Sequence, residues 1–206
     1  MSFTHYFSKD ANKRAKFIFN LIAPIYGKVD AGLVKNYAYA IGIVGGQIDI
    51  KGMRVLDLGT GTGAWAEMFR LKGAEKVQGI DFSAKMLEAA RQKHPEISFV
   101  NGDAENLINI DDNSFDLVTA SYVLHGVKEN KRRKMLEEMN RVSRKYVVIH
   151  DFAGRTSLFL QFLEFMERSD YKNFKKGFCD ELKRLFPVTK KIDSIHGGGL
   201  YFAIKR

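Results

Sequence analysis

The 206-residue sequence has one cysteine, three prolines and no long apolar run. Because Cys179 is the only cysteine, the chain can form no internal disulfide bond and no thiolate metal cluster. No stretch approaches the roughly 18 apolar residues of a membrane-spanning helix, and residues 1–16 lack the apolar core of a secretory signal. We therefore expect a protein of the reducing cytoplasm.

Several catalytic patterns are also missing. The five histidines have no close repeated spacing, so the sequence predicts no metal site. It contains neither the G-x-S-x-G turn typical of hydrolases nor the G-x-x-x-x-G-K-[ST] phosphate loop. Serine hydrolases and P-loop nucleotide hydrolases are therefore not expected.

The net charge of +9 is spread unevenly along the chain. Residues 1–52 and 151–206 each carry a net charge of +4, whereas residues 53–150 carry only +1. The excess consists of scattered pairs such as Lys175-Lys176 and Lys190-Lys191 and forms no dense tract. This pattern favours a solvated surface, and it leaves an anionic substrate or RNA open. The sequence makes no prediction of an oligomeric state.

From residue 53 to residue 150, apolar strand-like runs alternate with helix-like segments. The expected strands are 53–58, 76–80, 97–100, 115–120 and 145–149, and the expected helices are 64–72, 83–93 and 130–142. Runs rich in Val, Ile and Leu suit strands covered on both faces, and repeated βα units imply parallel strands with right-handed crossovers. We therefore predict an α/β doubly wound sheet, with ligands bound beyond the carboxyl ends of its strands.

The N-terminal flank is expected to be helical. Residues 11–24 and 31–44 have apolar residues at helical spacing, with Pro24 and Gly45-Gly46 as the expected stops. We interpret residues 1–52 as a helical lid on a single domain, whose cofactor-binding core is residues 53–206.

The C-terminal flank has a different pattern. Residues 157–168 are expected to form a helix with a broad apolar face, and 180–185 a short helix. Two strand-like runs, 188–195 and 200–204, flank Gly197-Gly198-Gly199 and predict an antiparallel hairpin at the edge of the sheet.

The stretch Val55–Gly63 joins the first strand to the first core helix through three glycines at alternate positions. Glycine permits backbone conformations closed to other residues and lets a ligand approach the main chain. Asp81 ends the second strand, where a carboxylate can accept hydrogen bonds from ribose hydroxyls. Gly59, Gly61 and Ala64 also fit the dinucleotide pattern G-x-G-x-x-G/A.

Two features count against a dinucleotide. Asp57 lies two residues before Gly59, where a carboxylate would repel a pyrophosphate but tolerate a cationic ligand. The terminal hairpin also replaces the strands of a second nucleotide-binding half.

Four motifs in order resemble those of class I S-adenosylmethionine (SAM)-dependent methyltransferases. They are Asp57-Leu-Gly-Thr-Gly-Thr-Gly63, Gly79-Ile-Asp-Phe-Ser83, Gly102-Asp-Ala104, and Phe115-Asp-Leu-Val118 followed by Leu124-His125. The segment from Phe19 to Tyr26 is similar to the start of the ubiquinone/menaquinone-biosynthesis C-methyltransferases (the type 11 group), although these usually have Tyr-Asp at Tyr26-Gly27. The resemblance implies a seven-stranded Rossmann-like sheet, mostly parallel with a C-terminal antiparallel hairpin and helices on both faces.

The resemblance also implies SAM as the cofactor and assigns roles to residues. The glycine loop would approach the methionine part of SAM, Asp57 its amino group and Asp81 its ribose. Cofactor contacts are implied for Asp57, Gly59, Thr60, Gly61, Gly63, Asp81, Phe82, Met86, Asp103, Ala104 and Ser121.

The acceptor side of the site is less defined. Tyr26 and Tyr122 are candidate substrate-binding residues, and His125 is a candidate for substrate contact and for the catalytic base. His150-Asp151, at the end of the fifth strand, is a further candidate pair. We expect methyl transfer to a small apolar or aromatic molecule, with methylation of RNA or protein as the alternative.

Overall fold

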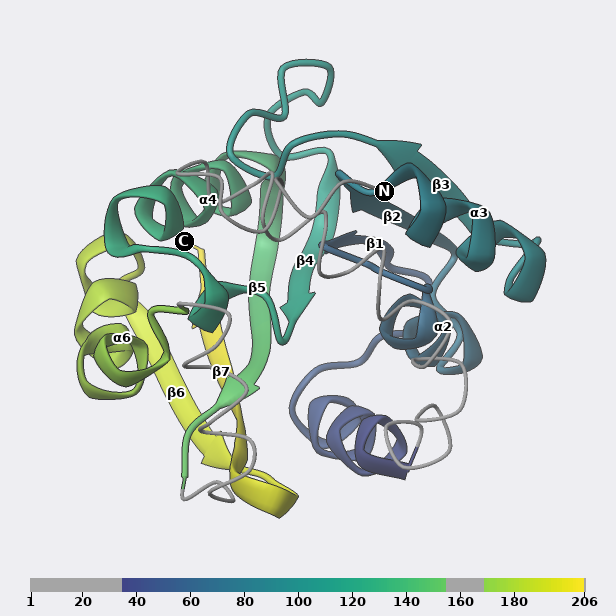
Figure 1. The fold of residues 1–206 in the computed structure, drawn as a ribbon. Helices are drawn as coiled ribbons and strands as arrows, with labels where there is room; N and C mark the ends of the chain where they lie inside the picture. Colours follow the sequence, from purple (N-terminus) through teal and green to yellow (C-terminus); the bar gives the residue numbers. More distant parts are fainter. Residues whose placement is uncertain (1–34, 155–168, 206) are drawn as a thin grey trace.

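The computed structural model describes residues 35–154 and 169–205. Seven strands form one sheet in the order β3-β2-β1-β4-β5-β7-β6 (Figure 1). The strands are β1 (Arg54–Leu58), β2 (Lys76–Asp81), β3 (Ser98–Asn101), β4 (Phe115–Ser121), β5 (Ser143–Phe152), β6 (Val188–Asp193) and β7 (Gly198–Ile204). β1 to β5 pair in parallel, whereas β7 is antiparallel to both β5 and β6. The predicted fold class is confirmed.

Helices cover both faces of this sheet (Figure 1). They are the segment 35–47, α2 (Ala64–Leu71), α3 (Ala84–Lys93), α4 (Glu129–Val142) and α6 (Tyr171–Leu185), with short 3-10 turns η2 (Leu124–Gly126) and η3 (Ile195–Gly197). As expected, Ser83 caps α3, and its hydroxyl accepts a hydrogen bond from the amide of Met86 at 3.4 Å. None of the described helices is long and apolar enough to cross a membrane.

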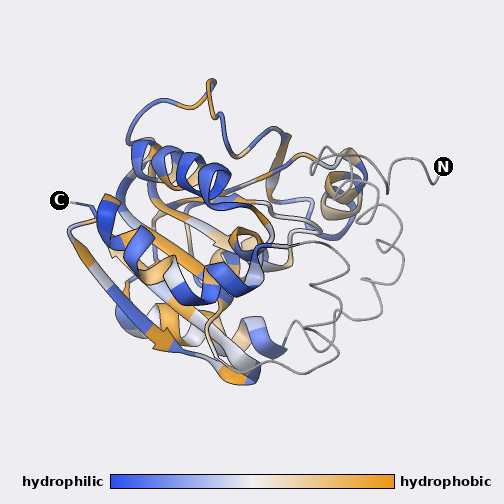
Figure 2. Cartoon of the chain, turned by 60° about the vertical axis from the view of Figure 1, so that its left-hand side comes forward, coloured by the Kyte–Doolittle hydropathy of each residue, from blue (hydrophilic) through white to orange (hydrophobic). Residues whose placement is uncertain are grey.

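Two apolar clusters pack against opposite faces of the sheet. Helices α4 and α6 cover one cluster, and α2, α3 and segment 35–47 cover the other. Along β1, Leu56 belongs to the first cluster and Val55 to the second, as the alternation of side chains on a strand requires. In Figure 2, hydrophobic residues lie mainly on the strands, and much of the helical ribbon in front of them is hydrophilic.

Three expected boundaries in the flanks are wrong. The helix at 35–47 runs through Gly45-Gly46, because buried Ile41, Val44 and Ile48 hold it against the sheet and the amide of Ile48 still bonds the carbonyl of Val44 at 2.9 Å. The short helix expected at 180–185 is the end of the 15-residue α6.

The missed half of α6 carries an aromatic stripe at helical spacing, Tyr171, Phe174 and Phe178, all of which are buried.

The third error concerns Gly198 and Gly199, which belong to β7 and form no turn. A Cβ on Gly199 would lie 2.4 Å from that of Ala153, so close packing explains the glycine. The helices expected at 11–24 and 157–168 lie outside the described residues.

β5 contains one residue more than β4 across their pairing. Phe115 is opposite Ser143, but Leu117 is opposite Tyr146, so the register shifts at a bulge formed by Arg144 and Lys145. Both side chains are about half exposed, at 57% and 54%. Beyond the bulge the pairing is regular to the end of β4, where Ser121 lies opposite His150.

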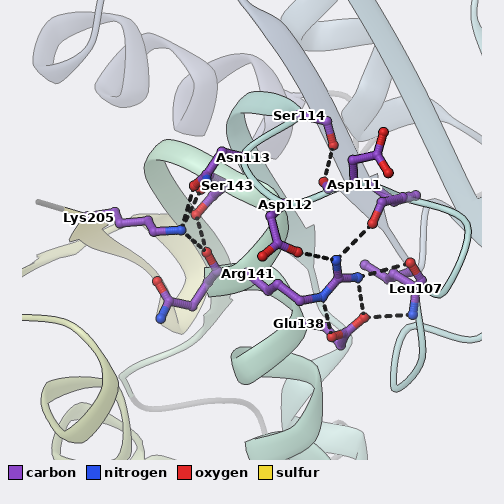
Figure 3. A network of polar contacts seen from close by, with 11 residues as sticks. Leu107, Asp111, Asp112, Asn113, Ser114, Glu138, Arg141, Ser143 and Lys205 are labelled. Atoms are coloured by element: carbon purple, nitrogen blue, oxygen red, sulfur yellow. Dashed lines mark hydrogen bonds and ion pairs between the residues drawn. The ribbon is translucent and has the colours of Figure 1, made fainter.

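Arg141, near the end of α4, ties the β3–β4 connection to this helix (Figure 3). Its guanidinium group forms a two-bond fork with Glu138, both at 2.8 Å, and contacts Asp112 at 2.7 Å. It also donates to the carbonyls of Ile110 and Leu107 at 2.8 and 3.0 Å. One side chain thereby satisfies two loop carbonyls at the end of the sheet away from the glycine loop.

Replacing Arg141 with methionine should destabilise the fold. We expect Arg141→Met to lower the free energy of unfolding by about 1–3 kcal/mol, because it removes charge-assisted bonds and leaves acceptors unpaired. Urea denaturation measures this loss. As the control, Arg133→Met on the same helix removes only an exposed ion pair at 3.6 Å and should cost less than about 0.5 kcal/mol. Equal losses in the two variants would contradict the structural role of Arg141.

Candidate active site

The strand order reverses between β1 and β4, which opens a crevice at their carboxyl ends. The loop after β1 enters this crevice, and Gly59, Gly61 and Gly63 have positive φ angles of 67°, 55° and 83°. A Cβ on Gly59 would lie 2.5 Å from Val123, and one on Gly63 would lie 2.7 Å from Phe99. A Cβ on Gly61 would meet no described atom within 4 Å. Packing therefore requires two of the glycines, whereas Gly61 presents open backbone to the crevice.

Asp81 at the end of β2 fixes the conformation of this loop. One carboxylate oxygen accepts from the amide of Gly61 at 2.9 Å, and the other accepts from the amide of Ser83 at 2.7 Å. Burial raises the pKa of Asp81, and the two amide hydrogen bonds oppose that rise. Each oxygen can accept a second hydrogen bond, so the carboxylate retains capacity for ligand hydroxyl groups.

Asp57 is buried, and its carboxylate has no hydrogen-bond partner in the described part of the chain. Its side chain is 1% exposed, and neither of its oxygens accepts a hydrogen bond from the described residues. Burial raises its pKa to about 7; the Thr60 hydroxyl is near enough to oppose this rise, and the charge of Asp81 adds to it. A buried carboxylate in this state favours a cationic group supplied from outside the described residues.

Polar and aromatic side chains continue from Asp57 across the neighbouring strands. Thr119 of β4 lies opposite Asp57, accepts a hydrogen bond from the Trp65 indole at 2.9 Å and donates to the carbonyl of Val148 at 2.7 Å. On the next strand, His150 packs its ring 5.2 Å from that of Trp65 and 5.8 Å from that of Tyr37.

His150 is held as a neutral imidazole. Its Nδ1 lies 3.1 Å from the hydroxyl oxygen of Ser121, and burial lowers its pKa to about 4. This uncharged ring completes the aromatic group on the α2 side of the sheet.

Asp151, the next residue of β5, points to the opposite face and binds the turn η2. It is 0% exposed, and its Oδ1 lies 2.7 Å from Nδ1 of His125. The amides of Leu124 and His125 donate to Oδ2 at 3.0 and 3.2 Å, and the amide of Phe152 donates to Oδ1 at 2.8 Å. The structure therefore joins His125 and Asp151, two sequence candidates, into one buried pair.

Tyr122 links these two groups. Its backbone φ of 53° is unusual for a residue other than glycine, and its amide bonds the carbonyl of His150 at 2.8 Å. Its ring lies 4.8 Å from that of His150 and 5.0 Å from that of Phe152. Burial, aided by the charge of Asp151, raises the pKa of its phenol to about 12. Phe152 in turn contacts the ring of Tyr171 at 5.1 Å.

The remaining predicted residues either follow β2 or β3 in the chain or lie outside the residues that the structure describes. Phe82 is 39% exposed, Met86 is buried in α3 and Ala104 is partly buried against the core. Asp103 is exposed and accepts from the amide of Glu105 at 2.9 Å, so its contacts do not join it to the glycine loop. Tyr26 lies outside the described residues.

Sequence reasoning missed several contributors to the site, among them Trp65, Thr119 and Phe152. Trp65 and Thr119 bond each other on the α2 face of the sheet. The signal for Thr119 was a polar residue between the apolar Val118 and Ala120 of a buried strand. The signal for Trp65 was the only tryptophan of the chain, directly after the glycine loop.

Part of this chain is similar in sequence to known proteins. Residues 55–146 match the model of a family described as a methyltransferase domain. A demethylmenaquinone methyltransferase of Paenarthrobacter aurescens is 45% identical over 103 residues, which are 50% of this chain and 39% of that protein. Its counterpart in Thermotoga maritima is 35% identical over 99 residues, 48% of this chain and 42% of that protein. The chain thus spans about two fifths of the length of these curated relatives.

Solved structures match over a larger part of the chain. A SAM-dependent methyltransferase of Thermotoga maritima, described as a possible histamine N-methyltransferase, has a TM-score of 0.68 and 20% identity, covering 92% of this chain and 99% of that one. Magnesium protoporphyrin IX methyltransferase of Synechocystis, solved with bound S-adenosylhomocysteine (SAH), has a TM-score of 0.67 and 18% identity, covering 88% and 87%. The predicted resemblance to class I SAM-dependent methyltransferases is confirmed, because the family match covers residues 55–146 and the solved structures share the fold.

Gly61 and Gly63 should respond differently to replacement by alanine. Gly61→Ala and Gly63→Ala both place a Cβ at positive φ, which costs about 1–2 kcal/mol, but only Gly63→Ala also overlaps Phe99 and His94. We expect Gly63→Ala to lose more stability in urea denaturation. Gly61→Ala should lose more SAH affinity in calorimetry, and unchanged affinity would mean that no ligand approaches this backbone.

Replacing Asp57 should change stability and binding in opposite directions. The pKa of Asp57 is about 7 in the folded protein against 3.8 for an ordinary carboxyl. The unfolded chain therefore loses this proton first, and the free energy of unfolding falls as pH rises from about 4 to 7. The shift corresponds to on the order of 4 kcal/mol. Above pH 7, Asp57→Asn should therefore raise the melting temperature of the ligand-free protein, and the gain should vanish near pH 4.

The same variant should bind SAH about tenfold to a hundredfold more weakly, because it loses a charge-assisted contact. Asp193→Asn, at a carboxylate 76% exposed, is the matched control and should change neither quantity. If Asp57→Asn binds SAH as tightly as the wild type, Asp57 does not receive a cation.

Proposed function

We propose that this chain, which carries a SAM-dependent methyltransferase domain, transfers a methyl group to a small apolar or aromatic molecule. The activity of the whole chain is a proposal because the curated relatives match over only part of their length. The observation that supports cofactor binding most directly is the buried carboxylate of Asp57, without a partner among the described residues, beside the open backbone of Gly61.

The chemistry of the crevice fits SAM. Asp57 would receive the ammonium group of the methionine part, Gly61 would leave room for the chain of that part, and Asp81 would accept the ribose hydroxyls. The residues that we propose to contact the cofactor are those predicted from the sequence, namely Asp57, Gly59, Thr60, Gly61, Gly63, Asp81, Phe82, Met86, Asp103, Ala104 and Ser121. When bound, SAM supplies an electrophilic methyl group on a sulfonium centre.

The aromatic wall supports a flat, uncharged acceptor. The ring of Tyr122 adjoins those of His150 and Phe152, and Trp65 and Tyr37 extend the wall from His150 on the α2 side. These rings carry no formal charge near neutral pH, because the low pKa of His150 keeps its imidazole neutral. Such surfaces bind aromatic molecules better than anionic ones. The demethylmenaquinone methyltransferases among the relatives make a quinone-type aromatic the first acceptor to test.

We assign His125 as the base that removes a proton from the acceptor. Asp151 holds Nδ1 at 2.7 Å and favours the tautomer with the proton on that nitrogen, which makes Nε2 the basic nitrogen. Burial of both groups excludes water from their hydrogen bond. Tyr122 lies 6.5 Å from His125 between ring centres and would contact the acceptor.

Methylation of RNA or protein remains the alternative, because the net charge of +9 lies mainly in the flanks. Labelled methyl transfer from SAM to a hydroquinone, a simple phenol and unmodified tRNA distinguishes the two. Transfer to the aromatic acceptors supports the proposal, whereas transfer to tRNA that falls steeply with salt supports the alternative.

Cofactor binding is tested with SAH alone. Calorimetry should detect binding to the wild type and a loss of about tenfold to a hundredfold in Asp81→Ala, which removes a charged acceptor of the ribose hydroxyls. No binding of SAH to the wild type would refute the proposed function, and unchanged affinity in Asp81→Ala would refute the ribose assignment.

Replacing His125 with asparagine should separate chemistry from binding. The amide nitrogen of asparagine can replace Nδ1 as the donor to Asp151, but the basic nitrogen is lost. We expect kcat to fall by roughly 10²–10⁴-fold with SAH affinity within about twofold of wild type. His196→Asn, at an exposed residue with φ of 54° that asparagine tolerates, should leave kcat unchanged. A normal kcat in His125→Asn would exclude His125 as the base.

A further inference from the structure

A buried arginine lies behind the His125 turn. Arg132 of α4 is 0% exposed, and its Nε and Nη2 donate to the two carboxylate oxygens of Glu181 at 2.7 and 2.8 Å. Nη2 also donates to Asp170 at 3.2 Å, and the guanidinium carbon lies 5.4 Å from the centre of the Phe174 ring. Both carboxylates belong to α6 or to the residue that precedes it.

The remaining donors of Arg132 bind the backbone on both sides of His125. Nη1 donates to the carbonyl of Leu124 at 3.2 Å and to that of Val127 at 2.6 Å. With the bonds to Glu181 and Asp170, these contacts use all five N–H groups of the guanidinium. Among the described residues, no other side chain donates a hydrogen bond to the carbonyl of Leu124 or Val127.

The turn is therefore held from two directions. Asp151 of β5 accepts from the amides of Leu124 and His125, while Arg132 of α4 donates to the carbonyls of Leu124 and Val127. Opposed anchors on the N–H and C=O groups of one short turn fix its orientation, and with it the direction of the imidazole. A buried charged cluster contributes little net stability compared with apolar packing, so its geometric effect is the better reason for its presence.

We propose that Arg132 is a positioning residue for His125, which aims the imidazole by holding the turn η2 against α6. The role of His125 rests on the proposed function, but its orientation is a property of the folded protein. α6 also carries Tyr171, whose ring contacts Phe152, and the ring of Phe152 lies 4.7 Å from that of His125. Arg132 thus holds the base and the aromatic wall in one arrangement.

Arg141 on the same helix provides a matched control. Like Arg132, it forms a fork with a glutamate, contacts an aspartate and donates to two backbone carbonyls (Figure 3). Its glutamate, however, lies on α4 itself, and the aspartate and carbonyls lie in the β3–β4 connection. Arg132→Lys and Arg141→Lys remove the same kinds of bond at the two ends of α4. Because the Arg132 side chain is 0% exposed and that of Arg141 30%, a purely structural role of Arg132 predicts a larger loss of stability in Arg132→Lys but no loss of kcat in the folded protein.

The kinetic test measures methyl transfer by these variants to whichever of the hydroquinone, the phenol and tRNA the wild type methylates fastest. We expect Arg132→Lys to lower kcat by roughly 10- to 100-fold, as misplacement of a catalytic group does, with KM and SAH affinity within about threefold of wild type. Arg141→Lys should leave kcat within about twofold. In a His125→Asn background, Arg132→Lys should cause no further loss of kcat, because the group that it positions is already absent. Equal losses with and without His125, or in both lysine variants, would overturn the proposal.

A second test needs no activity. NMR of the imidazole detects the Nδ1 proton of His125 that the hydrogen bond to Asp151 protects from exchange. We expect this signal in the wild type and in Arg141→Lys, and its loss or broadening in Arg132→Lys. Glu181→Gln, which weakens the fork but keeps Arg132, should give an intermediate result and serves if the arginine variants do not fold. A signal unchanged in Arg132→Lys and Glu181→Gln would refute the positioning role even if no methyl acceptor is ever found.

Discussion

Parallel pairing of β1 with both β2 and β4 determines where the polar groups of this protein lie. Because all of these strands point the same way, their carboxyl ends meet at one edge, and Asp57, Asp81 and Ser121 reach it together. The reversal of strand order at β1 keeps helices from covering that edge. Everything that we assign to the cofactor or the acceptor follows from side chains placed on or just beyond these strand ends.

Three buried carboxylates at this edge differ in how many donors surround them. Asp151 accepts four hydrogen bonds, Asp81 accepts two from backbone amides, and Asp57 accepts none from the described residues. The fully bonded carboxylate orients a histidine, whereas the unbonded one is the carboxylate that we propose to receive a cation. The number of donors around each acid therefore distinguishes a preorganised side of this edge from the side that, in our proposal, the ligand completes.

Much of this arrangement could be predicted from local pattern. The glycine spacing, the acid after β2 and the apolar runs from β1 to β5 predict the sheet and its crevice, because each depends on neighbours within a few residues. The pairing of His125 with Asp151 joins residues that are 26 positions apart, and the bonds of Arg132 to Glu181 of α6 join residues 49 positions apart, so no spacing rule reveals them. The full extent of α6 was detectable from its aromatic stripe, but the run of lysines between the aromatics obscured it.

The bulge near the start of β5 affects both faces of the site. Beyond it, His150 points toward Trp65 and Asp151 toward His125, and this phase exists because β5 holds one residue more than β4 between Phe115 and Leu117. Arg144 and Lys145 at the bulge are half exposed, and their charged groups pair with Asp116 of β4. The number of residues at that point matters more. With one residue fewer, the side chains of His150 and Asp151 would exchange faces of the sheet. The number of residues in the bulge at one end of β5 thus determines which side chains face each layer at the other end.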